Sequence, residues 1–115
     1  MQMILRAHAS LWHWSQREDC TDQNLSIGYW QASRIYALLG QADNARRYGQ
    51  LCLDVSQEQE PFDLGFAYEA LARAEAVAGN RQRSNEYSGQ GREAARRVSS
   101  DDDRKTLLDD LDSID

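Results

Sequence analysis

The sequence has little proline, little cysteine and no long apolar run. Its 115 residues include one proline and two cysteines, Cys20 and Cys52. A single proline argues against a proline-rich extended chain, and two cysteines do not form the framework of a disulfide-stapled domain. No apolar stretch approaches the roughly 20 residues of a membrane-spanning helix, and no signal-peptide core precedes Arg6. We therefore expect a cytoplasmic protein with reduced thiols and no membrane association.

The chain also lacks an excess of positive charge and any familiar catalytic motif. It carries 13 Lys and Arg residues against 19 Asp and Glu residues, a formal net charge of −6. Nucleic acids recruit basic surfaces, so this balance argues against a nucleic-acid partner. The sequence contains no glycine-rich phosphate loop, no nucleophile elbow and no metal-ligand motif. These absences predict a protein that is not an enzyme and that holds no cofactor.

Hydrophobic spacing is helical along the whole chain. Apolar residues recur at i, i+3, i+4 and i+7, and no stretch alternates with period two over the length of a strand. In one segment, for example, the apolar stripe begins at Phe66 and Ala67 and continues through Leu71. Apolar residues make up 41% of the chain, which is enough for one core. The sequence therefore predicts a single all-α domain over residues 1–115, with about six antiparallel helices.

Glycine, proline and capping residues mark the ends of the predicted helices. Gly40 and Gly79 each follow a periodic segment, where glycine readily adopts the left-handed conformation that ends a helix. Pro61 suits a first helical turn, and Asn80 and Ser100 are favoured N-cap residues. The predicted elements are an N-terminal helix over 1–19, helical pairs over 25–57 and 61–98, and a C-terminal capping helix over 100–113.

The chain matches itself when it is shifted by 39 residues. Segment 28–40 then overlies segment 67–79. The identical pairs include Tyr29 with Tyr68, Arg34 with Arg73, Gly40 with Gly79 and Tyr48 with Tyr87. A self-match at such a period indicates stacked helical hairpins, in which each unit buries its apolar face against the next.

The two repeat units resemble tetratricopeptide repeats, a family that places aromatic, small and glycine residues at fixed offsets. The corresponding positions here are Tyr29, Ala32, Ser33, Tyr36, Gly40 and Ala45 in the first unit, and Tyr68, Leu71, Ala72, Gly79 and Ser84 in the second. The units depart from the family pattern because Glu75 replaces an aromatic residue and the period is about five residues longer than usual. The resemblance implies a short right-handed α-solenoid of hairpins. The whole chain is also similar to bacterial helical-repeat proteins.

The resemblance further implies a protein-interaction function. Tetratricopeptide repeats bind extended peptides in a concave groove lined by the first helix of each hairpin. The groove positions that this implies here are Trp30, Arg34, Leu38, Glu69 and Arg73. An arginine beside a tryptophan suits a partner carboxylate, which it holds by two parallel hydrogen bonds. In the alternative interpretation, Glu69 pairs with Arg73 four residues on, and Trp30 packs on the first helix.

Two other functions remain open from the sequence. The end faces of a short repeat array often pair, so a self-associating homodimer is one alternative, with contacts near Trp14 or Leu107. The other is a small-ligand or metal-binding protein, suggested by the cluster of His8, Trp12 and His13. The two histidines lie about 140° apart around a helix, whereas a shared metal favours a spacing of four residues. One packed and one surface histidine explain the cluster as well, so no metal site is predicted.

Glu75 contradicts the apolar pattern of its helix. Burial of a carboxylate is costly unless the group is paired and hydrogen-bonded. We therefore expect Glu75 to bond Arg34, Arg73 or a tyrosine hydroxyl.

Overall fold

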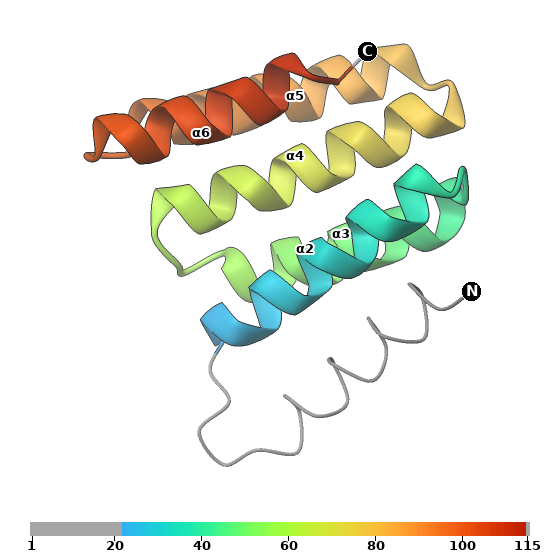
Figure 1. The fold of residues 1–115 in the computed structure, drawn as a ribbon, viewed down its shortest axis with the longest axis horizontal. Coiled ribbons are helices and arrows are strands. Elements are labelled where there is room, and N and C mark those ends of the chain that lie inside the picture. The colour runs from blue at the N-terminus through green and yellow to red at the C-terminus, as the bar shows by residue number, and fades with distance from the viewer. Residues whose placement is uncertain (1–21, 115) are drawn as a thin grey trace.

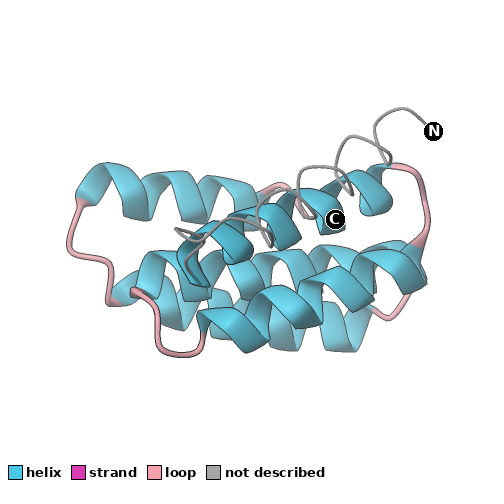
Figure 2. Cartoon of the chain, turned by 90° about the horizontal axis from the view of Figure 1, so that it is seen from below, coloured by secondary structure: helices cyan, strands magenta, loops and turns pink. Residues whose placement is uncertain are grey.

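The computed structural model describes residues 22–114, and within this range every regular element is a helix. The elements are α2 (Asp22–Leu38), α3 (Ala42–Ser56), α4 (Pro61–Ala78), α5 (Arg81–Arg96) and α6 (Asp101–Asp112) (Figure 1). Short loops connect them, as Figure 2 shows from below. The predicted all-α class is thus confirmed for this part of the chain. The helix predicted over 1–19 lies outside the described residues, as do His8, Trp12 and His13.

The described helices form two layers, and α4 is the middle helix of one of them. The closest helix pairs are α2 with α3 and α4 with α5, and α4 also contacts α2, α3 and α6. In Figure 1, α2, α4 and α6 lie on the side of the viewer, whereas α3 and α5 lie behind them. Because α4 contacts each of the other four helices, its residues hold the two layers together.

The predicted helix ends at Gly40 and Gly79 are confirmed. Both glycines have a positive φ, 74° and 84°. After each of them, the backbone turns back onto the helix that it ends. The N–H groups of Gln41 and Asn80 donate to carbonyl oxygens five residues earlier, each over 2.9 Å. Pro61 occupies the first turn of α4, as the sequence predicted. These local signals fix where α2 and α4 stop and where α4 begins.

Of the two predicted N-cap side chains, only one makes a cap. The Ser100 hydroxyl accepts a hydrogen bond from the Asp103 backbone N–H over 3.3 Å. Asn80 precedes α5 but makes no side-chain cap. Its Nδ2 instead donates to Oε2 of Glu75 over 3.1 Å. This bond to a charged acceptor sets the orientation of the Asn80 amide.

The 39-residue repeat is visible in the contacts between aromatic rings. Tyr29 and Tyr48 join α2 to α3, with ring centroids 6.3 Å apart. Tyr68 and Tyr87 occupy the corresponding positions on α4 and α5, and their centroids lie 6.5 Å apart. The two helix pairs therefore share one packing geometry at this contact.

Two buried hydroxyl groups mark a second repeated contact, with the roles reversed. In the first pair, Ser33 Oγ of α2 donates to the Ala45 carbonyl of α3 over 2.7 Å. In the second, Ser84 Oγ of α5 donates to the Ala72 carbonyl of α4 over 2.9 Å. A shift of 39 residues places Ser33 on Ala72 and Ala45 on Ser84. The donor thus comes from the first helix in one pair and from the second helix in the other.

Leucines of α6 fill the space left by two glycines. Leu107 lies over Gly65 of α4, where an added Cβ atom would collide with the leucine side chain. Leu111 lies over Gly91 of α5, where its Cδ2 atom is 3.0 Å from the position of such a Cβ atom. Leu107 is 0% exposed. It therefore belongs to the core and offers no exposed surface for the homodimer contact predicted near it.

We expect Gly40→Ala and Gly79→Ala each to lower the free energy of unfolding by about 1 kcal/mol, because a Cβ atom disfavours their left-handed backbone. A steric clash with neighbouring residues is not the cause of this loss, since nothing lies within 4 Å of either added Cβ atom. The control is Gly89→Ala in α5, which also has open space but a negative φ. This variant should gain about 0.5–1 kcal/mol from helix propensity. Urea unfolding measures all three, and a loss at Gly89 equal to the others would contradict the backbone explanation.

Candidate functional site

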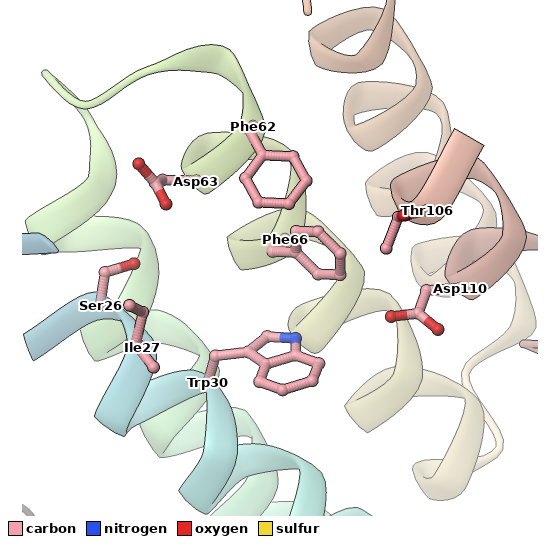
Figure 3. A pocket seen from close by; sticks show the side chains of 8 residues that line it. All are labelled: Ser26, Ile27, Trp30, Phe62, Asp63, Phe66, Thr106 and Asp110. Carbon is pink, nitrogen blue, oxygen red and sulfur yellow. The ribbon is translucent and has the colours of Figure 1, made fainter. Parts of the chain in front are cut away.

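A cavity opens on the face formed by α2, α4 and α6. Its volume is about 290 Å³. The lining consists of Ser26, Ile27 and Trp30 from α2, Phe62, Asp63 and Phe66 from α4, and Thr106 and Asp110 from α6 (Figure 3). Three helices thus each contribute to one site. Apolar side chains make up its wall, and a carboxylate stands on either side of it.

The wall of the cavity is a series of three aromatic rings. Trp30 and Phe66 meet edge to face, with centroids 5.6 Å apart and an interplanar angle of 84°. Phe62 and Phe66, one helical turn apart on α4, meet at 4.9 Å and 75°. Edge-to-face pairs are a favoured aromatic geometry, so each ring restricts the next. Ile27, which is 48% exposed, extends the apolar surface along α2.

A buried carboxylate fixes the Trp30 side chain. Glu69 is 0% exposed, and its Oε2 accepts a hydrogen bond from Trp30 Nε1 over 2.7 Å. Its Oε1 accepts from Arg73 Nε over 2.9 Å, so the ion pair predicted as the alternative for these two residues is confirmed. Arg34 Nη1 lies 3.6 Å from the same oxygen. The indole is therefore held in one orientation beside the cavity.

The two arginines of the predicted groove have partners within the protein. Arg34 lies over the Trp30 ring, 5.7 Å from its centroid, and 3.9 Å from Asp110 Oδ2. Arg73 Nη2 donates to the Asp110 carbonyl over 3.2 Å and to Ser113 Oγ over 2.8 Å. Both guanidinium groups therefore join the central helices to α6. This geometry gives them a structural role, because each guanidinium already faces oxygen atoms of Glu69 and of Asp110.

Two carboxyl groups near the cavity have pKa values above the usual range. Burial raises the pKa of Glu69, against the opposing effects of Trp30, Arg73 and Arg34. Burial also raises the pKa of Asp63, and the nearby charge of Glu60 adds to the shift. Burial disfavours the charged form of both carboxyl groups, but only Glu69 has two arginines beside it that oppose this effect. Among the described residues, no cationic side chain forms an ion pair with Asp63.

The predicted groove overlaps this site only in part. Trp30 lines the cavity, and Arg34, Glu69 and Arg73 form the network beside it. Leu38 stands apart: it is 66% exposed at the end of α2 and is not in the lining. The predicted groove omits the remaining seven lining residues, which are Ser26, Ile27, Phe62, Asp63, Phe66, Thr106 and Asp110. The repeat offers one signal for them, since a shift of 39 residues places Ile27 on Phe66.

The predicted partners of Glu75 are wrong. Glu75 accepts hydrogen bonds from Arg46 Nε of α3 and from Asn80 Nδ2, and its Oε2 lies 3.7 Å from Arg83 Nε of α5. Burial opposes its ionisation, but these three groups together hold the pKa of Glu75 below its usual value. The reason is position, because Glu75 lies on the side of α4 that meets α3 and α5. It takes no part in the cavity.

Known proteins give no further guide to the site. No family model matches the chain, and no curated protein and no solved structure is similar enough to count as a match. Over residues 22–114, no helix is both long and apolar enough to cross a membrane. Within the same range, no group of three His, Cys, Asp or Glu side chains is placed to hold a metal ion. The described residues define an all-helical protein with an aromatic cavity flanked by acidic groups.

Proposed function

We propose that this protein is a protein-interaction module of tetratricopeptide-like kind, which binds an extended segment of a partner protein across α2, α4 and α6. The observation that carries the proposal is the aromatic cavity. Trp30, Phe62 and Phe66 are only half-buried, and exposed Ile27 adjoins them. Aromatic side chains grouped in a partly desolvated pocket are typical anchor points of protein interfaces.

The spacing of the helices supports the same function. The three helices that line the cavity begin at residues 22, 61 and 101, intervals of 39 and 40 residues. The first two, α2 and α4, begin the two repeat units, and α6 follows the second unit at nearly the same interval. In the family that the sequence resembles, this is the surface that holds the ligand. The cavity therefore lies where a tetratricopeptide-like arrangement would present it.

The size of the cavity favours a side chain over a whole small molecule. Pockets for drug-sized ligands have volumes of about 300–1,000 Å³, and this cavity, at about 290 Å³, lies at the lower limit. One or two side chains of a peptide would fill it. The remaining affinity would come from contacts of the peptide along the three helices.

The test is binding of a random library of short acetylated and amidated peptides to the ¹⁵N-labelled full chain. We expect bound peptides to shift the indole N–H resonance of Trp30. Ile27→Ser should weaken their binding about fivefold to tenfold, because it removes an apolar part of the cavity. Leu38→Ser is the matched control: it removes an exposed apolar residue from the same helix, outside the cavity. The absence of any binding peptide, or equal losses in the two variants, would contradict the proposal.

The same two variants test a homodimer that forms through another surface than the one predicted near Trp14 or Leu107. Leu38 and Val77 occupy equivalent positions at the ends of α2 and α4, and both are exposed. If these residues mediated self-association, sedimentation would show a dimer that dissociates on the change Leu38→Ser and persists on the change Ile27→Ser.

A further inference from the structure

Asp63 is a buried acid beside an apolar cavity, and no cationic side chain of residues 22–114 forms an ion pair with it. It is 9% exposed and contributes to the lining together with Phe62 and Phe66. Its carboxylate accepts a hydrogen bond from Gln23, and Glu60 adds a second negative charge nearby. A buried charge is costly unless an opposite charge lies beside it. The site therefore favours a ligand that brings a positive charge.

The surroundings of the cavity have the same sign. On the opposite side of the aromatic wall, Asp110 faces the cavity from α6 (Figure 3). A neighbouring cavity of about 250 Å³ shares Phe62 and Asp63 with the first and has Glu60, Asp103 and one arginine, Arg97, in its lining. Acidic groups thus outnumber basic groups around both cavities. The whole chain has a formal net charge of −6, which would also attract a basic partner.

We propose, building on the function proposed above, that the partner segment inserts a lysine or arginine side chain into this cavity. The apolar stem lies against Trp30 and Phe66, and the cationic head is bound by Asp63. Such a side chain matches both properties of the site, because its methylene stem covers apolar surface while its head carries the charge. The Phe62 and Phe66 rings add a favourable interaction with the cation, whereas the Trp30 ring already has Arg34 over it.

The geometry of the arginines explains why an acidic partner is disfavoured. Arg34 and Arg73 are both directed at Glu69 and at α6. A partner carboxylate in the cavity would meet Asp63 and Asp110, and of these two only Asp110 has an arginine, Arg34, within 4 Å among the described residues. Repulsion between like charges at an interface weakens the wrong partner.

The test compares peptides that differ at one position. The best peptide from the library is synthesised with lysine, arginine, norleucine or glutamate at the position that contacts Trp30. Norleucine keeps the stem of lysine and lacks its charge. We expect the lysine and arginine peptides to bind at least about tenfold more tightly than the norleucine peptide, since hydrogen bonds to charged groups are the stronger ones. The glutamate peptide should bind most weakly.

Asp63→Asn is the decisive variant, because it removes the charge and keeps the size of the side chain. It should weaken the lysine peptide about tenfold and leave the norleucine peptide unchanged. Asp54→Asn is the matched control: it changes the net charge equally, at an exposed position on α3 outside both cavities. Its effect should stay within about twofold at physiological salt, because distant exposed charges are screened. Melting temperatures of both variants show whether they are folded.

Each outcome bears on a different claim. If peptides bind at Trp30 but norleucine is as good as lysine, the inference is wrong and the proposed function stands. If no peptide binds, both fail. The last probe is Nα-acetyl-lysine methylamide, which keeps the lysine ammonium group and lacks the rest of the peptide. If it binds as tightly as the lysine peptide, the cavity recognises a single lysine side chain, and the claim that it binds an extended partner segment is wrong.

Discussion

Replacing Glu69 by alanine is expected to lower the free energy of unfolding by about 3 kcal/mol, because a buried acceptor disappears from a network that depends on it. The Trp30 N–H donates to Glu69 and would lose this acceptor inside the protein. Arg73 would keep its contacts with α6 but lose its ion pair. The alanine would also leave a void beside the aromatic wall. Urea unfolding of the variant and of the parent protein measures the loss.

One further substitution separates hydrogen bonding from charge at Glu69, and another, on α5, is an exposed control. Glu69→Gln keeps an oxygen that can accept from Trp30 but turns an NH2 group toward Arg73, so it should cost about 1–2 kcal/mol, less than the alanine variant. Glu93→Ala removes an exposed ion pair with Arg96 on α5 and should cost less than about 0.5 kcal/mol. A loss for Glu69→Ala as small as that for Glu93→Ala would show that the network does not hold the indole in place.

Leu107→Ala is expected to lower the free energy of unfolding by about 3 kcal/mol, since it removes a fully buried side chain from the space above Gly65. Of the described helices, α6 packs its backbone against α4 and α5, and Arg34 of α2 adds one ion pair to it. Loss of this anchor should therefore loosen α6 more than the rest of the protein. Amide exchange would reveal that difference, because local opening needs less free energy than global unfolding.

Lys105→Ala on the same helix is the control for that experiment. Lys105 is exposed and pairs with Asp109. Its replacement should change stability by less than about 0.5 kcal/mol and leave amide exchange in α6 nearly unchanged.

Leu107→Ala should also weaken peptide binding, because Thr106 and Asp110 of α6 form one side of the cavity. Uniformly faster exchange throughout α2–α6 would show that α6 unfolds only with the whole protein.

The helices were predictable because their ends depend on local chemistry. The left-handed glycines at 40 and 79 and the proline at 61 act through their own backbone, whatever surrounds them. The self-match at 39 residues also predicted which helices carry equivalent contacts. The helix predicted over 100–113 corresponds to α6, which begins one residue and ends one residue inside that range.

The cavity was less predictable because it depends on how helices lie against each other. Phe66 belongs to the apolar stripe of α4, and a stripe does not distinguish a core position from a cavity wall. Asp110 and Thr106 lie on a helix that was expected only to cap the array. Trp30 and Glu69, by contrast, are exactly one repeat apart and bond to each other. Equivalent positions in neighbouring units thus touch at this point, a relation that the repeat itself contains.

The reversed serine contacts have a consequence for how the chain folds. Two similar hairpins in one chain invite a mistaken pairing, in which the first helix of one joins the second helix of the other. The correct pairs each contain one serine, Ser33 or Ser84, opposite an alanine carbonyl. A mistaken pair of α2 with α5 would bring both serines together, and one of α4 with α3 would have no hydroxyl at this contact. The correct pairs thus differ from the mistaken pairs at this contact, because each correct pair has one hydroxyl there and a mistaken pair would have two or none.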